Sequence, residues 1–363
     1  MKKILILANH YNTLRIFRRE LIKELVAQGN QVVVCIPTAD DENINILKSY
    51  GCEVEITDME RRGMNPLKDI SLMFKYIKLI KKIKPDKVIT YTIKCNIYGS
   101  LASSILKVDH YVNVTGLGSA FQTDNFIKRM IIILYKLALR KANLVFFENV
   151  GNRDVFVENK IITKDRTVVM PGAGVNLQEF EFTPYPQSDE TRFLFVGRIM
   201  KEKGVDELFY AIRKLKKKYS NIRFEFIGWY EDDYEKEVEE LQEEGLITYY
   251  GFKPDVRPYI RNSHCIILPS YHEGMSNTLL EAAAMGRPLI TTDIHGCKEA
   301  VSDGVNGYLC NLKDKIDLTN KIEVFIRLSN ESKIKMSAKS RRLMEDIFDK
   351  NYVVSETIKN LSK

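Results

Sequence analysis

The 363-residue sequence contains only six cysteines, and they include no Cys-x-x-Cys pair. Cysteines so widely separated argue against a disulfide scaffold and against a zinc ribbon. The five histidines show no metal-ligand spacing with cysteine or carboxylate side chains. No Asp-x-Asp pair is present to clamp a nucleotide-bound divalent ion. We therefore expect no metal site and no cofactor.

Long apolar runs are also absent. The apolar stretch that begins at Ile4 stops at Asn9 with no small-residue cleavage site after it, so we interpret it as a buried strand and not as a signal peptide. The run from Met130 to Tyr135 is cut by a lysine, far short of the ~18 apolar residues of a membrane span. We expect a cytoplasmic protein that is not integral to a membrane.

Motifs for two other classes of protein are missing. Neither half opens with Gly-x-Gly-x-x-Gly after its first predicted strand, which excludes a dinucleotide-dependent dehydrogenase. No helix-turn-helix, zinc finger or aromatic-basic sheet motif is recognisable. Nucleic acid is therefore not an expected partner.

What is present is the pattern of a folded, two-domain α/β protein. The composition is 45% hydrophobic and 28% charged, and the length exceeds one ordinary hydrophobic core. Short β-rich runs alternate with helix-length amphipathic stretches, which predicts parallel sheets covered by helices on both faces. The predicted strands are 4–8, 31–36, 53–57, 87–91, 111–115 and 144–148, then 192–197, 223–228, 247–251, 265–269, 289–292 and 307–310.

A stretch rich in proline, glycine and serine near 175–190 is the predicted linker. We expect two doubly wound, Rossmann-like domains at 1–180 and 181–340. A C-terminal helix at 341–363 would cross back to the first domain. Ligands of open α/β sheets bind beyond the carboxyl ends of the strands, so the cleft between the two domains is the expected site.

The net charge of +7 is unevenly distributed. Residues 1–185 hold 27 Lys and Arg against 19 Asp and Glu, whereas residues 186–363 hold 28 against 29. The helix predicted at 65–84 combines lysines with a broad apolar surface, and the helix at 125–142 is similar. An anionic membrane surface would suit these helices, although packing on the sheet with lysines in water is the alternative.

The first segment that suggests chemistry follows the strand at 192–197. Gly197 makes the turn, and Arg198 and Lys203 precede a helix that begins near Gly204. Fixed positive charge beside a helix N-terminus favours phosphate, and two spaced cations suit a diphosphate. A solvated loop with incidental cations is the alternative for this segment taken alone.

A second segment follows the strand that ends at Pro269. Glu273 and Glu281 flank a small-residue turn whose backbone amides can approach an anion. Glu281 falls about two helical turns beyond Glu273, on the helix that follows. A carboxylate inside such a site can accept two hydrogen bonds from the adjacent hydroxyls of a ribose or hexose.

At these residues the sequence resembles the family-4 retaining glycosyltransferases of GT-B fold, and the resemblance extends over nearly the whole chain. The matching segments are Gly197-Arg198, Glu202-Lys203-Gly204, Glu273-x7-Glu281 with Gly274-Met275-Ser276-Asn277, Gly286-Arg287-Pro288 and Gly296-Cys297-Lys298-Glu299. Lys94-Cys95-Asn96-Ile97-Tyr98-Gly99, Val114-Thr115-Gly116-Leu117-Gly118 and Pro171-Gly172-Ala173-Gly174 resemble the bacterial subgroup that builds capsule, exopolysaccharide or O-antigen units. Some members of that subgroup are called galacturonosyltransferase-like.

The resemblance implies a role for each matching residue. Arg198 and Lys203 would bind the donor's diphosphate, and Glu273 would bind hydroxyls of the donor sugar. These three are the expected catalytic residues. Glu281 would bind the ribose. The other expected nucleotide-sugar-binding residues are Gly197, Gly228, Val256, Gly274, Met275, Ser276, Asn277 and Thr278, where Gly228 and the loop 251–256 serve the base.

The first domain matches less well. Many relatives carry a glycine-rich turn after the first strand, where this chain has Asn9-His10-Tyr11-Asn12-Thr13. His110 is expected to be a surface or packing histidine, and His10 is the better candidate for the cleft by its location. The candidates on the acceptor side are Asn9, His10, Thr13, Lys94 and Gly116.

Together these observations predict a metal-independent, retaining glycosyltransferase. It would move a sugar from a nucleotide diphosphate donor, UDP-linked by expectation, to a polyprenyl-diphosphate-linked glycan. The enzyme would be peripheral on the inner face of the plasma membrane, with the anionic membrane surface as a partner. A UDP-sugar epimerase of the same two-domain architecture is the alternative, and a non-catalytic nucleotide-sugar binder is a third class.

Overall fold

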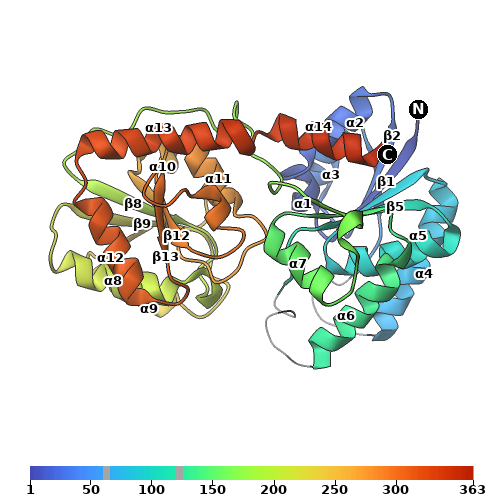
Figure 1. The fold of residues 1–363 in the computed structure, drawn as a ribbon, viewed down its shortest axis with the longest axis horizontal. Helices are drawn as coiled ribbons and strands as arrows, with labels where there is room; N and C mark the ends of the chain where they lie inside the picture. Colours follow the sequence, from blue (N-terminus) through green and yellow to red (C-terminus); the bar gives the residue numbers. More distant parts are fainter. Residues whose placement is uncertain (60–65, 119–120, 122–125, 363) are drawn as a thin grey trace. The chain divides into compact units, whose positions relative to one another are not determined.

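The computed structural model describes residues 1–59, 66–118, 121 and 126–362 (Figure 1). The chain forms two compact units, one of Met1–Ala173 with Asn351–Lys363 and the other of Gly174–Lys350. The chain thus passes between the units at 173/174 and again at 350/351, whereas the limits expected from the sequence were 180/181 and 340/341.

Unit 1 is built on a parallel sheet, which has seven strands among the described residues, in the order β3-β2-β1-β4-β5-β6-β7. The strands are β1 Lys3–Leu7, β2 Gln31–Ile36, β3 Glu53–Ile56, β4 Lys87–Tyr91, β5 Asp109–Val114, β6 Leu144–Phe147 and β7 Thr167–Val169. The helices are α1 Tyr11–Arg15, α2 Arg19–Ala27, α3 Asp41–Lys48, α4 Pro66–Ile83, η1 Cys95–Gly99, α5 Ser100–Leu106, α6 Phe126–Ala138, η3 Leu139–Lys141, α7 Val150–Glu158 and η4 Lys164–Arg166.

Unit 2 repeats the design with a parallel sheet in the order β10-β9-β8-β11-β12-β13. Its strands are β8 Thr191–Val196, β9 Ile222–Ile227, β10 Thr248–Tyr249, β11 Cys265–Leu268, β12 Leu289–Thr292 and β13 Gly307–Cys310. The helices are η5 Lys201–Lys203, α8 Val205–Lys216, α9 Glu235–Glu243, α10 Arg257–Asn262, α11 Asn277–Ala284, η6 Lys298–Ala300, α12 Lys315–Ile326 and α13 Asn330–Ile347.

The predicted fold class is confirmed. Both sheets are parallel, and every strand expected from the sequence is present with its ends shifted by no more than two residues. Strands such as β2 and β11 are buried on both faces because helices cover both faces of each sheet, and this is why they appear in the sequence as short continuous apolar runs.

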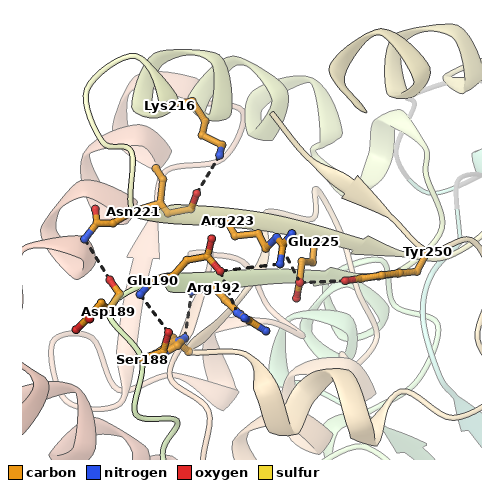
Figure 2. Close-up of polar contacts among 11 residues, drawn as sticks. Ser188, Asp189, Glu190, Arg192, Lys216, Asn221, Arg223, Glu225 and Tyr250 are labelled. Carbon is orange, nitrogen blue, oxygen red and sulfur yellow. Dashed lines mark hydrogen bonds and ion pairs between the residues drawn. The ribbon is translucent and has the colours of Figure 1, made fainter. Parts of the chain in front are cut away.

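The two faces of β8 and β9 differ in chemistry. On one face Phe193 stacks on Phe224, and Phe195 stacks on Phe226, with ring centroids 5.1 and 5.2 Å apart. Figure 2 shows the polar contacts of these strands, where Glu190 pairs with both Arg192 and Arg223, and Arg223 Nε lies 4.0 Å from Glu225 Oε1. Glu225 is buried and accepts a hydrogen bond of 3.1 Å from the Tyr250 hydroxyl. The buried carboxylate thus has partners, as buried charge requires.

The C-terminal helix expected at 341–363 is two helices. α13 ends at Ile347, and α14 runs from Lys350 to Leu361. At the break, the Val175 N–H donates to Phe348 O at 2.8 Å and the Lys350 N–H donates to Val175 O at 3.0 Å. The side chains of Val353, Val354 and Leu361 then pack in the hydrophobic core of unit 1. The break was not visible in the sequence because it depends on this distant pairing with Val175.

The basic helix expected at 65–84 is α4, whose bounds are Pro66–Ile83; Arg61, Arg62 and Asn65 lie outside the described residues. On one side of the helix Leu72, Tyr76, Leu79, Ile80 and Ile83 are buried. Leu67, Ile70 and Phe74 are 80%, 49% and 60% exposed. The helix at 125–142 is α6 with η3, and Asn125 lies outside the described residues.

Candidate active site

The predicted donor residues of unit 2 gather at the carboxyl edge of its sheet. Arg198 follows β8, Gly228 follows β9, and Glu273 follows β11, and β8 lies between β9 and β11. Parallel strands place all their carboxyl ends at one edge, which is where open α/β sheets bind ligands.

Gly228 lets the ends of β8 and β9 come close together. A Cβ on Gly228 would lie 1.8 Å from the Gly197 carbonyl oxygen, so no side chain fits there. The Gly228 N–H donates to Gly251 O at 3.1 Å, which adds the end of β10 to the same edge. The requirement for glycine at position 228 is therefore steric, whereas a Cβ on Gly197 would make only ordinary contacts with Phe195 and Leu268.

Lys203 and Glu273 are in direct contact. The Lys203 ammonium forms an ion pair with Glu273 Oε1, and both side chains are mostly buried. The Ser270 hydroxyl donates to the same carboxylate oxygen at 3.0 Å. Gly204 makes this contact possible, because its φ of 71° starts α8 and a Cβ there would lie 2.1 Å from the Pro269 carbonyl oxygen.

Arg198 is more accessible than Lys203. Its guanidinium Nη1 lies 3.7 Å from Glu231 Oε2, and its side chain is 38% exposed. Arg198 and Lys203 both act electrostatically on His272, as do Glu202 and Glu273. The two predicted cations therefore lie in one small region with two carboxylates. A diphosphate that binds here would have to compete with these carboxylates for the cations.

The turn 274–278 leads into α11. The Ser276 N–H donates to Gly296 O at 2.8 Å, which fixes the turn against the loop after β12. The first turn of α11 leaves backbone N–H groups with no intrahelical acceptor, including those of Asn277 and Thr278. The Met275 side chain is buried in the core, so only its backbone can contact a ligand. Asn277 and Thr278 can present main-chain N–H groups in the same way, whereas the Ser276 N–H is already bonded to Gly296 O.

Glu281 lies further along α11 and has different neighbours. Burial raises the pKa of the Glu281 carboxyl to about 7; Lys350 opposes this shift and Glu179 adds to it. These neighbours come from the start of α14 and from the segment before β8, and not from the Arg198 and Lys203 region. The charged groups that act on Glu281 thus differ from those that surround His272.

The sequence analysis missed three residues at this edge. His272 directly precedes Glu273, and its Nε2 lies 3.5 Å from Glu202 Oε2; burial lowers the pKa of the imidazole. Trp229 and Phe252 directly follow Gly228 and Gly251 and are exposed. All three residues could have been predicted from the sequence, because each is adjacent to a predicted site residue or loop. Val256 caps α10 and packs partly against the core.

Arg287 is a structural residue. Its buried guanidinium donates to the carbonyl oxygens of Ile260, Thr183, Pro184 and Arg261, and burial lowers its pKa to about 10. The Arg287 side chain thus holds the segment 183–184, which enters unit 2, against α10.

In unit 1, the predicted acceptor residues also follow strand ends. Asn9 and His10 follow β1, Lys94 follows β4, and Gly116 follows β5; these three strands are neighbours in the sheet. Thr13 lies on α1, within one helical turn of His10. His10 Nδ1 accepts a hydrogen bond from the Asn12 N–H at 3.1 Å.

Lys94 is paired within unit 1. Its ammonium lies 2.9 Å from Asp69 Oδ1 on α4, and both side chains are mostly buried. A ligand phosphate would therefore compete with Asp69 for this cation. His110 lies in β5 and is buried, which fits the packing role expected of it.

No group of three or more histidine, cysteine, aspartate or glutamate side chains among the described residues is placed to hold a metal ion. Among the same residues, no helix has the length and apolar character that crossing a bilayer requires.

Comparison with protein families gives one match in each half of the chain. Residues 3–149 match the family described as "Glycosyl transferase 4-like", and residues 190–327 match the family described as "Glycosyl transferases group 1". The second match contains all the predicted donor residues, and the first contains all the predicted acceptor residues.

Curated relatives match over most of the chain. The N,N'-diacetylbacillosaminyl-diphospho-undecaprenol alpha-1,3-N-acetylgalactosaminyltransferase of Campylobacter jejuni is 26% identical, over 94% of this chain and 94% of its own. The capsular polysaccharide biosynthesis glycosyltransferase CapM of Staphylococcus aureus is 23% identical, over 86% of this chain and 88% of its own.

Solved structures match the whole fold. Anabaena HepE, crystallised with UDP-glucose, is similar with a TM-score of 0.82 and 19% identity, over 100% of both chains. The lipopolysaccharide outer core galactosyltransferase WaaB is similar with a TM-score of 0.75 and 18% identity, over 99% of both chains. These likenesses confirm the predicted GT-B arrangement of each sheet and its helices.

Proposed function

We propose that this chain, which is a glycosyltransferase of the group 1, family-4-like type, transfers a sugar from a UDP-linked donor to a glycan on a polyprenyl diphosphate. Use of a nucleotide-sugar donor is common to this type of enzyme. UDP is the proposed nucleotide because HepE is similar over its full length and was crystallised with UDP-glucose. The lipid-linked acceptor is proposed because the Campylobacter relative is named for one.

The observation that carries the proposal is the contact between Lys203 and Glu273 beside Arg198. A donor has its anomeric carbon bonded to a phosphate, so cations for the diphosphate and a carboxylate for sugar hydroxyls must lie within a few ångströms of each other. Lys203 and Glu273 meet this requirement from two different strand ends. Glu281 would take the ribose hydroxyls from α11.

The proposed reaction retains the configuration of the anomeric carbon. The bond from this carbon to the phosphate oxygen breaks, and the acceptor hydroxyl forms its new bond on the face that the phosphate leaves. The hydroxyl proton passes to the departing phosphate oxygen. Arg198, Lys203 and the N-terminal amides of α11 would stabilise the charge on the diphosphate. Glu273 is ion-paired to Lys203 and hydrogen-bonded to Ser270, which suits hydroxyl binding better than attack.

The donor sugar is tested with a panel of UDP-sugars that includes UDP-N-acetylgalactosamine and UDP-galacturonic acid. Each is incubated with a polyprenyl-diphosphate-linked glycan, and UDP release and product mass are measured. Transfer with matched UDP release is the expected result. A change of the UDP-sugar without UDP release would instead indicate the epimerase, an activity that neither matching family description names.

We propose that the reaction needs no divalent metal, because Arg198 and Lys203 would supply the charge that a metal supplies elsewhere. We expect initial rates in excess EDTA to equal those in Mg²⁺ or Mn²⁺. Loss of activity in EDTA that is restored by either metal would contradict this proposal.

Peripheral binding to the inner membrane face is proposed for α4. Leu67, Ile70 and Phe74 form an exposed apolar stripe, and Lys78 and Lys81 are exposed on the same helix. Each lysine near an anionic surface contributes about 1 kcal/mol. We expect sedimentation with anionic vesicles that weakens in high salt and in Phe74→Gln, but not in the control Ile316→Gln, whose side chain is exposed on α12. Equal binding of the protein to neutral and to anionic vesicles would contradict the proposed electrostatic attraction to the membrane.

Donor affinity should depend on the ionisation of Glu281. A carboxyl with a pKa near 7 is protonated below that pH and accepts two hydroxyl hydrogen bonds only above it. The diphosphate of a UDP-sugar does not titrate between pH 6 and pH 8. We therefore expect the Kd of a UDP-sugar to fall about tenfold from pH 6 to pH 8. Calorimetry checks this, and the pH dependence should vanish in Glu281→Gln. A wild-type Kd that stays constant would show that Glu281 does not bind the donor in its ionised form.

A further inference from the structure

Tyr271 lies two residues before Glu273 and joins the loop after β11 to the start of α8. Its hydroxyl lies 2.9 Å from Glu207 Oε1 and 2.8 Å from Glu207 Oε2, and it donates a hydrogen bond to this carboxylate. Its backbone N–H donates to the Glu202 carbonyl oxygen at 2.8 Å. Glu202 and Glu207 lie on either side of Lys203 in the sequence, so Tyr271 is held at two points that flank this cation.

The two bonds of Tyr271 fix the segment 270–273 relative to α8. Glu273 reaches the Lys203 ammonium from this segment. The Ser270 hydroxyl also bonds to Glu273, but Ser270 belongs to the same segment. Ser270 therefore orients the carboxylate within its own segment, whereas Tyr271 determines where that segment lies relative to Lys203.

The hydroxyl and the ring of Tyr271 make separate contacts. The Lys313 ammonium lies 4.8 Å from the centroid of the ring, within the range of a cation–π contact. The hydroxyl is bonded to Glu207 alone among the contacts described above. The hydrogen bond to Glu207 can therefore be removed by substitution while the ring and its contact with Lys313 are kept.

We propose that Tyr271 is a positioning residue, which sets the place of Glu273 relative to Lys203 through its hydrogen bond to Glu207. The inference rests on the proposed function, because it takes Glu273 to bind hydroxyls of the donor sugar. A misplacement of about 1 Å in a site that orients a substrate can cost about 10²-fold in rate. Loss of the Glu207 bond should cost less than this, because the backbone bond to Glu202 remains.

Tyr271→Phe tests the proposal, since it removes the hydroxyl and keeps the ring. We expect kcat for sugar transfer to fall about tenfold. The Kd of UDP should stay unchanged, because UDP has no sugar for Glu273 to bind. Steady-state kinetics and calorimetry give the two values. A rise in the Kd of UDP that matches the fall in kcat would overturn the proposal, because the substitution would then disturb the whole donor site.

Tyr234→Phe is the matched control. The Tyr234 hydroxyl donates to Asp206 Oδ1 at 2.6 Å, and Asp206 directly precedes Glu207 in the first turn of α8. Tyr234 and Tyr271 are both half-buried. The control thus breaks the same kind of bond at the same helix turn, but the bond belongs to the loop between β9 and α9. We expect a normal kcat, and equal losses in the two variants would overturn the proposal.

Glu207→Gln and Glu207→Ala test the hydrogen bond from its other end. The amide oxygen of glutamine can still accept the Tyr271 hydrogen, so Glu207→Gln should keep a kcat close to that of the wild type. Glu207→Ala removes the acceptor and should lower kcat as Tyr271→Phe does, with no further loss when the two substitutions are combined. Additive losses in the combined variant would overturn the proposal.

The outcomes separate this inference from the proposed function. A normal kcat in Tyr271→Phe, measured beside an active wild-type protein, would refute the positioning role and leave the proposed function intact. Failure of the wild-type protein to transfer a sugar from any UDP-sugar of the panel would refute both.

Discussion

Replacing Lys203 by alanine lowers turnover by at least ~10²-fold, and replacing Arg198 by alanine does the same, if these cations hold the leaving diphosphate. Charge on the diphosphate grows as its bond to the sugar breaks, so each cation stabilises the transition state more than the bound donor. A factor of ~10² corresponds to about 2.7 kcal/mol of activation free energy. Steady-state kcat for sugar transfer is the measurement.

Lys201→Ala is the matched control for Lys203→Ala. Lys201 lies in the same short helix η5, is exposed, and carries the same charge. Its loss changes the net charge equally but leaves the Lys203 and Glu273 contact in place, so we expect nearly normal turnover. Thermal unfolding of each variant checks that the fold is intact. Near-normal turnover in Lys203→Ala, or an equal loss in Lys201→Ala, would contradict the assigned role.

Gly204→Ala should destabilise unit 2 and lower activity together. The added Cβ would lie 2.1 Å from the Pro269 carbonyl oxygen, so α8 or the end of β11 must shift. The left-handed backbone conformation costs about 1–2 kcal/mol for an alanine. Overpacking adds about 1–3 kcal/mol. Any such shift moves Lys203, the neighbouring residue, away from Glu273.

Gly245→Ala separates strain from steric overlap. Gly245 has a φ of 68°, close to the 71° of Gly204, but nothing lies within 4 Å of a Cβ placed on it. Replacing Gly245 by alanine should therefore lower the stability of unit 2 only by the cost of the left-handed backbone conformation, and it should leave turnover unchanged. The fluorescence of Trp229, which lies in unit 2, follows the unfolding of that unit in both variants. Equal melting temperatures for the two variants would show that the Gly204 contact is not required.

The sequence was sufficient to predict the elements that depend on local pattern. Buried parallel strands such as β2, β4 and β12 appear as apolar runs whose limits agree with the structure residue for residue. The start of α8 after Gly204 was also predictable, because a glycine before an amphipathic stretch is a local signal. These features need only neighbouring residues to form.

Features that depend on distant contacts could not be predicted in the same way. The pairing of Lys203 with Glu273 joins two strand ends 70 residues apart. The break between α13 and α14 depends on Val175, and the exposure of Phe74 depends on which stripe of α4 packs on the sheet. The resemblance to known glycosyltransferases named Lys203 and Glu273 separately, but their direct contact became visible only in three dimensions.

The central claim is retaining transfer from a nucleotide sugar without a covalent intermediate, and the linkage of the product tests it most directly. Purified protein is given an α-linked UDP-sugar that it uses and a polyprenyl-diphosphate-linked glycan, and the anomeric coupling in the product is measured by NMR. An α-linked product, with no glycosyl adduct on Glu273 in mass spectra of trapped enzyme, is the predicted result. A β-linked product would contradict retention, and an adduct on Glu273 would contradict attack from the leaving-group face.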